Sequence, residues 1–457
     1  MNLAALLLGP AIRNRDADKR RIGWFEAVPA MGLDALGSSS YGPEAALTIL
    51  APLGLAGSVA LGPITAAIVA LLAVLYLSYR QTIVAYPVSA GGYVVARDNL
   101  GEYPSLLAAA GLLLDYVLNV AVGISAGVGA LISTVPSLHP FALPLCFGIL
   151  LVIVVANLRG TGEAGWLFAL PAYLFILSFI GIMAFGVFEA VAGGWHLAPA
   201  VPPPAPAPST AAVSLWLLVR AFASGCTAMT GVEAVSNGVG AFREPVVPNA
   251  HRTLTIIVCV LALLLVGVAI LAPMLGIGAM DERQPGYRSV MSQLAAAIVG
   301  QGPLYYVAMA SLLAVLCLSA NTSFVAFPRL CRLVAADGYL PKSFAIAGRR
   351  LVFTSGIIFL AIAAGALIFA FGGLTDPLIP LFAIGAFSTF TLSQAGMVAH
   401  WRRKHGTRWQ LGINLFGAVV TGATLIVILV AKFTEGAWLT VIAIPLVIVL
   451  LKSIHRY

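Results

Sequence analysis

The chain has 457 residues, of which 60% are hydrophobic and 9% charged, and its formal net charge is +8. This composition excludes a water-soluble domain, and segments that are apolar on every side exclude the alternating strands of an outer-membrane barrel. We therefore expect an all-α polytopic protein embedded in a lipid bilayer. The excess of basic residues then reflects membrane topology, so no nucleic-acid partner is expected. The five cysteines lack metal-ligand spacing, and no cofactor is expected.

Twelve hydrophobic segments are long enough to cross a bilayer as helices. They span residues 24–53, 57–80, 104–134, 140–158, 164–192, 212–241, 253–278, 303–334, 351–372, 377–399, 411–431 and 435–452. With the N-terminus inside, 21 of the 25 Lys and Arg residues fall in inside segments and 3 in outside segments. This bias predicts that both termini are cytoplasmic. No secretory signal is expected, which favours a bacterial inner membrane.

Two of these spans contain stretches that disfavour a continuous helix. Residues 37–43 of the first span are Gly, Ser, Tyr and Pro, and residues 226–238 of the sixth contain several Thr, Gly, Ser and Asn. Such interruptions are tolerated where the freed backbone faces a cavity or other protein. Breaks in spans one and six, which run in opposite directions, are typical of a five-plus-five inverted repeat. We therefore expect broken helices 1 and 6 whose ends meet near the midplane.

The expected organisation follows from these spans. It comprises a cytoplasmic tail over 1–23, a first repeat over 24–192, an extracellular Pro-rich loop over 193–211, a second repeat over 212–399, and two last spans with a short C-terminus over 400–457. No long cytosolic region is expected after the last span.

Carboxylates inside the spans are candidates for function, because a charge within a membrane is unfavourable. Asp34 is predicted near the C-terminal end of a half-helix, where the dipole disfavours a negative charge, so a cation, a proton or a base is expected beside it. Glu44 is predicted in the first turn of the next half-helix, and Thr230 with Glu233 fits a capping box. For both glutamates a structural and a functional role stay open.

The third span contains a polar stripe. Asp115 lies eleven residues after Pro104, or about 16 Å of helix, which places it near the centre of the bilayer. Asn119 and Gly123 follow at four-residue spacing and share its face. A hydrogen bond to a neighbouring helix could explain one buried Asp, but binding of a cation or proton is favoured.

Arg220 is the one basic residue within a span, and it lies nearer the outside. It could extend to the interface or act in an outer gate. Tyr76 and Tyr79 are expected among the aromatic residues of the membrane interface, with Trp195 and Trp438.

Several stretches of this sequence match a known family. They are DAL at 34–36, YGPE at 41–44, PVSAGGY at 87–93, LDY at 114–116, TGVEAVSN at 230–237, ANTSF at 320–324, DGYLP at 337–341 and LSQAGM at 392–397. The chain resembles the amino acid–polyamine–organocation superfamily, with its LeuT-type five-plus-five inverted repeat, and within it the KimA-type potassium importers.

The resemblance implies a cation and proton site lined by five residues: Asp34, Tyr41, Asp115, Thr230 and Glu233. Asp34, Asp115 and Thr230 would hold K⁺, which needs several oxygen ligands. The chain departs from the importer pattern at Asn119, Gly123 and Phe382, where hydroxyl residues are expected.

These features predict a secondary active transporter that works by alternating access, with proton-coupled uptake of potassium and with Asp34, Asp115 and Glu233 as proton-coupling residues. The alternative is a proton-coupled permease for an amino acid, a cationic amino acid or a polyamine. In that case the free N–H groups at Ser38 to Gly42 could hold a substrate carboxylate. An enzyme is not expected, because no H-E-x-x-H or G-x-S-x-G motif is present. The expected partners are the small substrate, the lipid bilayer and, in a homodimer, a second copy of the chain.

Overall fold

The computed structural model describes residues 21–88, 91–159, 165–205, 208–346 and 353–455. Within these ranges the regular structure is helical, apart from one isolated parallel bridge between Ile22 and Phe242. The α-helices are α2 (Trp24–Leu50), α3 (Leu55–Ala85), α4 (Gly92–Leu100), α5 (Glu102–Thr134), α6 (Ala142–Leu158), α7 (Gly165–Ala192), α8 (Leu215–Gly225), α9 (Ala234–Asn237), α10 (Val246–Leu275), α11 (Val290–Val299), α12 (Pro303–Ala336), α13 (Thr354–Ala370), α14 (Ile379–Arg403), α15 (Arg408–Lys432) and α16 (Ala437–His455). Short 3-10 helices join several of them: η3 (Ala51–Leu53), η4 (Pro136–Phe141), η5 (Cys226–Met229), η6 (Val239–Ala241), η7 (Lys342–Phe344) and η8 (Phe433–Glu435).

The all-helical membrane architecture is confirmed. Ten helical segments of the described chain are long and apolar enough to cross a membrane. The other two expected spans correspond to α2, which carries three carboxylates, and to α13, which has 17 residues. The count of twelve spans and the inverted repeat stay predictions, and residues 1–20 of the expected tail lie outside the described residues.

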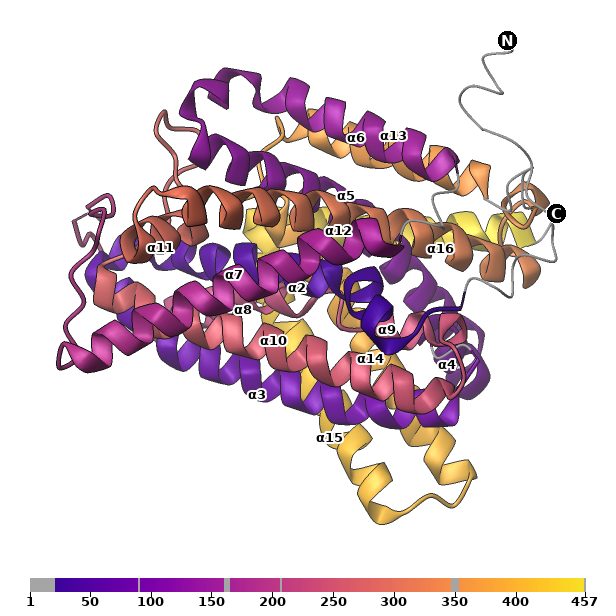
Figure 1. Ribbon diagram of the computed structural model, residues 1–457. Coiled ribbons are helices and arrows are strands. Elements are labelled where there is room, and N and C mark those ends of the chain that lie inside the picture. Colours follow the sequence, from indigo (N-terminus) through magenta and orange to yellow (C-terminus); the bar gives the residue numbers. More distant parts are fainter. Residues whose placement is uncertain (1–20, 89–90, 160–164, 206–207, 347–352, 456–457) are drawn as a thin grey trace, which may run out of the picture.

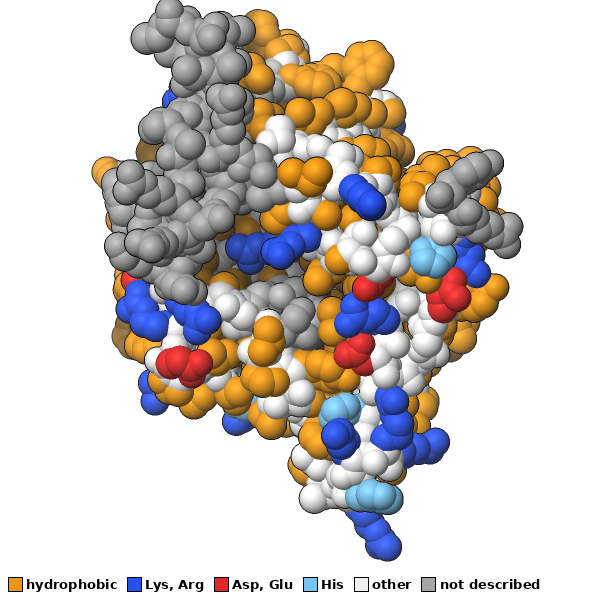
Figure 2. All heavy atoms as spheres, turned by 90° about the vertical axis from the view of Figure 1, so that its right-hand side faces the viewer, with side chains coloured by type: hydrophobic (Ala, Val, Ile, Leu, Met, Phe, Trp, Pro, Cys, Tyr) orange, Lys and Arg blue, Asp and Glu red, His pale blue; other side chains and the backbone are white. Residues whose placement is uncertain are grey.

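The long helices run side by side between two faces of the molecule (Figure 1). We call the face where α2 begins and α16 ends the terminal face, and the opposite face, which carries α11 and the loop after α7, the distal face. Lys and Arg side chains are spread over the terminal face, with fewer Asp and Glu among them (Figure 2). Of the spanning segments, α5 and α14 are the most deeply buried and α6 and α16 the least.

Helix α2 is continuous, and the predicted interruption at residues 37–43 is therefore wrong. The hydroxyl groups of Ser38, Ser39 and Ser40 each donate a hydrogen bond to the carbonyl three residues earlier. The serine hydroxyls thus form hydrogen bonds with carbonyls of the helix and do not compete with its backbone hydrogen bonds. Pro43 removes one N–H, which leaves the Ser39 carbonyl without its helical donor but does not end the helix. Glu44 consequently lies within a helix and not in a first turn, and Asp34 lies in the same helix and not near a C-terminal end.

The sixth span is broken as predicted. Helix α8 ends at Gly225, η5 continues to Met229, and the chain turns over residues 230–233 before the single turn of α9. Gly231 has a φ of +82°, which is strained for any residue with a side chain. The expected capping box is wrong, because α9 has no side-chain cap and the Thr230 hydroxyl instead donates to the Thr227 carbonyl at 3.0 Å.

Candidate functional site

Asp34 on α2 lies directly against the turn that breaks the sixth span. A Cβ atom placed on Gly231 would come within 2.6 Å of the Asp34 Cβ and Cγ atoms. No side chain at position 231 could leave this contact intact, since 3.0 Å is already closer than such atoms approach. The positive φ and the missing Cβ of Gly231 therefore together allow the backbone of the break to lie beside the Asp34 carboxylate.

Two further contacts join α2 to the broken span. The Tyr41 and Thr230 hydroxyls share a hydrogen bond of 3.1 Å. The Ser38 hydroxyl lies 2.6 Å from the Ala228 carbonyl as well as 2.9 Å from its own helix carbonyl at Ala35. Ser38 is thus occupied in joining two segments, and its backbone belongs to a continuous helix. An exposed row of N–H groups at this position, as the permease alternative required, is not present.

Asp115 and Asn119 approach the same region from α5. Asp115 packs against α14, where its Cβ lies 3.3 Å from the position that a Cβ on Gly385 would occupy. Asn119 donates from Nδ2 to the Ser323 hydroxyl of α12 at 2.8 Å, which leaves its Oδ1 atom buried without a donor. The four-residue spacing therefore places an uncommitted carboxylate oxygen and an uncommitted amide oxygen on one buried face.

Three buried carboxylates form the centre of the site. Asp34, Asp115 and Glu233 are 5%, 1% and 2% exposed, and each has one oxygen without a hydrogen-bond partner. Glu233 is near enough to Asp34 and Asp115 for their charges to interact, and Asp34 interacts with Asp115 in the same way. In the described part of the chain none of the three forms an ion pair. Such a cluster is unfavourable unless a cation or protons compensate it.

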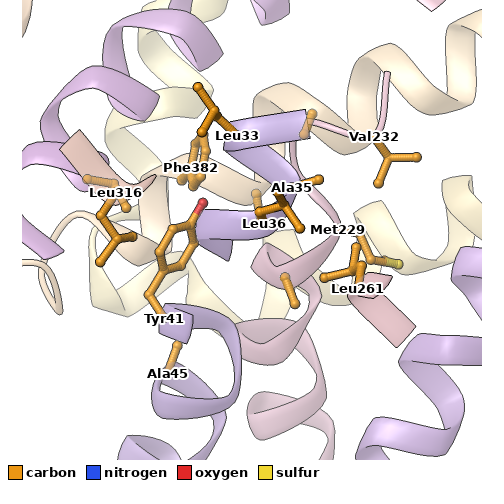
Figure 3. Packing of buried hydrophobic residues seen from close by; sticks show 14 of the residues in the cluster. Leu33, Ala35, Leu36, Tyr41, Ala45, Met229, Val232, Leu261, Leu316 and Phe382 are labelled. Carbon is orange, nitrogen blue, oxygen red and sulfur yellow. The ribbon is translucent and has the colours of Figure 1, made fainter. Parts of the chain in front are cut away.

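The three positions that depart from the importer pattern have distinct surroundings. Gly123 packs against α12, with a Cβ position only 2.6 Å from the Ser319 hydroxyl, so that a hydroxyl from α12 occupies this space. Asn119 supplies the amide oxygen Oδ1 in place of a hydroxyl oxygen. Phe382 of α14 is fully buried, and its ring centroid lies 6.3 Å from that of Tyr41, with the two rings side by side in Figure 3. Phe382 therefore contributes an apolar wall and no ligand.

A cavity of about 310 Å³ connects this centre with the terminal face. Asp34 and Glu233 line its inner end, and Tyr93, Arg329 and Leu333 are among the residues nearer the surface. We call it the terminal cavity. Its walls are mostly apolar, so charges within it are screened less than charges at an open surface.

The distal side of the centre is closed. Beyond Tyr41 lies a cavity of only about 20 Å³, lined by Glu44, Glu282, Tyr287 and Asp376 among others. A depression of about 530 Å³ on the distal face does not reach any of the three central carboxylates. The Tyr287 hydroxyl donates to the Glu44 carboxylate at 2.8 Å and so joins α2 to the loop before α11. Among the described residues, the site is accordingly open toward the terminal face and closed toward the distal face.

The distal loop is also held by a second carboxylate. Glu282 accepts hydrogen bonds from the backbone N–H groups of Thr375 and Asp376 at 2.7 and 3.2 Å. Burial, followed by the charge of Asp376, raises the pKa of Glu282 to about 7. Burial likewise raises the pKa of Asp376, to about 6.

Arg220 does not reach the central site. Its guanidinium forms an ion pair with Glu435 of η8, with the Nε atom donating at 2.9 Å. This pair fastens α8 to the connection between α15 and α16 on the distal side. The gating role predicted for Arg220 stays a prediction.

Sequence reasoning missed three residues that the structure places around the centre. Tyr79, expected at the membrane interface, is 4% exposed, and its hydroxyl has no partner. Tyr116 accepts a hydrogen bond from Asn237 at 3.2 Å and lines the terminal cavity. Ser323 binds Asn119. The polar run 321–323 within an apolar helix could have indicated Ser323, whereas nothing local separates a buried tyrosine from an interfacial one.

A helical membrane protein with buried carboxylates at a broken helix and a cavity that leads from them to one face has the features of a membrane transporter. Comparisons with known proteins agree. Residues 25–451 match the family described as amino acid permease. Over 463 aligned residues the chain is 39% identical to the potassium transporter KimA of Bacillus subtilis (strain 168), covering 100% of this chain and 74% of that protein. The chain belongs to the amino acid permease family, and it is a transporter and not an enzyme.

Solved structures give a more distant likeness. Two crystal structures of the Eremococcus coleocola manganese transporter, one of a mutant and one in complex with an aromatic bis-isothiourea substituted compound, each align with a TM-score of 0.48 at 12% identity. Each alignment covers 100% of this chain and 98% of the other.

Proposed function

We propose that this protein is a secondary active transporter that takes up potassium together with protons. The observation that carries the proposal is the set of three buried carboxylates, each with an oxygen that lacks a donor. The relative at 39% identity is named as a potassium transporter, which favours this ion among small cations. A dehydrated potassium ion needs several oxygen ligands, and carboxylate, amide and hydroxyl oxygens gather here.

The residues then divide into two roles. Asp34, Asp115 and the Thr230 hydroxyl bind K⁺, with the Asn119 oxygen as a further ligand. Glu233 exchanges protons with the terminal cavity, which it lines together with Asp34. Because the three charges interact, binding of a cation at one carboxylate and of a proton at another influence each other. That interaction is the physical basis of coupling.

The unequal cavities support alternating access. The bias of basic residues supports a cytoplasmic location of the terminal face. The structure would then correspond to an inward-facing state, with the cavity that reaches the carboxylates toward the cytoplasm and the distal path closed around Tyr41 and Glu44. An outward-facing state requires separation of Tyr287 from Glu44, since their hydrogen bond crosses that path.

A permease for a cationic amine is the second candidate. Phe382 favours it, because an aromatic wall without an oxygen suits the alkyl part of an amine better than a bare ion. Substrates with a free carboxylate are disfavoured by the three acidic side chains and by the continuity of α2.

Uptake into proteoliposomes separates these candidates. Rubidium, as a potassium surrogate, is supplied with and without an inward proton gradient to the wild type, to Asp115→Asn and to Glu189→Gln. Glu189 is an exposed carboxyl near the distal end of α7 and serves as the matched control. We expect gradient-dependent uptake by the wild type and the control, and its loss in Asp115→Asn. Uptake of lysine or putrescine without uptake of rubidium would instead identify an amine permease.

A further inference from the structure

The terminal cavity contains a positive charge that the proposed transport site does not use. Arg329 of α12 lines this cavity and is exposed within the chain. In the described ranges its guanidinium has no ion pair and no hydrogen bond, whereas those of Arg97 and Arg243 both have partners. An arginine in a largely apolar recess usually has a carboxylate beside it.

The position of Arg329 relative to the carboxylates follows from the course of α12. Ser323 binds Asn119 beside the carboxylates, and Arg329 follows six residues later, about 9 Å of helix nearer the end of α12. That end lies at the terminal face, where Gly338 contacts His455 of α16. Tyr116, Asp34 and Glu233 line the same cavity as Arg329. Tyr116 is fixed by the hydrogen bond from Asn237 of α9. Arg329 therefore lies between the carboxylates and the terminal face. A cation that leaves the site through this cavity passes a positive charge in the cavity wall.

We propose that Arg329 lowers the affinity of the carboxylate site for the transported cation when the site is open to the terminal cavity. This inference rests on the proposed function. Repulsion between two cations inside a cleft with mostly apolar walls is screened less than at an open surface, so one guanidinium has a measurable effect on a cation in the cavity. Arg329 thereby favours release into a compartment that already contains the cation, and it opposes rebinding from that side.

The prediction concerns one side of the membrane only. Because the distal path is closed in this state, Arg329 acts on cation that approaches through the terminal cavity and not on external cation. Its neutralisation is expected to strengthen inhibition by internal cation while leaving the external KM unchanged.

The test measures trans-inhibition in proteoliposomes with the terminal face toward the lumen. Vesicles are preloaded with increasing rubidium, and the initial rate of uptake of labelled rubidium is recorded for the wild type, Arg329→Gln, Arg329→Lys and Arg332→Gln. Arg332 is the matched control, because it loses the same charge on the same helix but stacks on Phe353 and does not line the cavity.

The internal rubidium concentration that halves the rate should fall about tenfold in Arg329→Gln. Arg329→Lys and Arg332→Gln should behave as the wild type. An unchanged internal concentration in Arg329→Gln, an equal change in Arg332→Gln, or complete loss of uptake by a folded Arg329→Gln would overturn the inference while the potassium proposal stands. Absence of rubidium uptake by the wild type would instead remove the proposed function, and this inference with it.

Discussion

Tyr41 of α2 and Thr230 of the broken sixth span share a hydrogen bond of 3.1 Å between their hydroxyl oxygens. Thr230 is fixed in turn by its bond to the Thr227 carbonyl. The pair connects a continuous helix to the backbone of the break and lies between the carboxylates and the closed distal path. In the proposed mechanism these hydroxyls are ligands of the cation and lie where the distal path is closed.

Removal of the Tyr41 hydroxyl should impair transport more than folding. A hydrogen bond of this kind contributes about 0.5–1.5 kcal/mol, so Tyr41→Phe should lower kcat/KM for rubidium up to about tenfold. Tyr305→Phe is the control, because Tyr305 also forms a buried hydroxyl bond, to Ser292 at 2.8 Å, away from the site. If both variants transport alike, Tyr41 has no special role.

The contact between Gly231 and Asp34 should tolerate no side chain. Gly231→Ala would place a Cβ 2.6 Å from Asp34 at a φ that costs an L-residue about 1–2 kcal/mol. We expect a lower Tm in detergent and loss of rubidium uptake. Gly148→Ala, at a glycine whose Cβ would meet nothing within 4 Å, should be neutral. Normal uptake by Gly231→Ala would show that the break is not held against Asp34.

Stability should depend on pH through Glu282. Burial raises the pKa of Glu282 from 4.5 to about 7, so the folded protein binds a proton there more tightly than the unfolded chain. The resulting stabilisation is complete below pH 4.5 and is lost as pH rises to about 7. Tm should accordingly fall by about 2–4 °C across this range and fall less in Glu282→Gln. An identical pH profile for the two proteins would contradict this assignment.

The ion pair between Arg220 and Glu435 permits a double-mutant cycle. Both side chains are partly exposed, so a coupling energy of about 1 kcal/mol is expected from the unfolding of Arg220→Gln, Glu435→Gln and the double variant. If Arg220 also acts in a distal gate, the single variants should change the external KM, and the double variant should restore part of it. A coupling energy of zero would show that the pair does not hold α8 to η8.

Lys432 at the end of α15 is only 1% exposed, and its Nζ atom has no hydrogen-bond partner. Burial of an ammonium without a hydrogen bond is unfavourable, although the charge of Glu435 and the C-terminal end of the helix offset part of the penalty. Lys432→Met keeps the length of the side chain and should raise the unfolding free energy by about 1 kcal/mol or more. A lower Tm would indicate that the ammonium is compensated in the folded protein.

Much of the site followed from residue type and spacing. Asp34, Asp115 and Glu233 stand out as charges within apolar spans, and the four-residue spacing put Asp115 and Asn119 on one face. The break in the sixth span followed from its composition. These features depend on residues close together in the chain, so they can be predicted from the sequence.

Other features depend on segments far apart in the chain. The serines of α2 have low helix propensity, yet their hydroxyls return to the helix carbonyls, and Ser38 gains the distant Ala228 carbonyl as well. Thr230 prefers Tyr41, nearly two hundred residues away, to the cap that its own sequence suggests. Tyr79 and Arg329 acquire their surroundings only when the helices pack. Propensity describes isolated segments and cannot foresee such contacts.

The central claim is that buried carboxylates couple a cation to a proton. The most direct measurement records pH inside proteoliposomes with a trapped fluorescent indicator while external rubidium is added at a clamped membrane potential. We predict acidification of the lumen that accompanies rubidium uptake in the wild type and disappears in Glu233→Gln. Rubidium uptake by the wild type without any acidification would contradict the account.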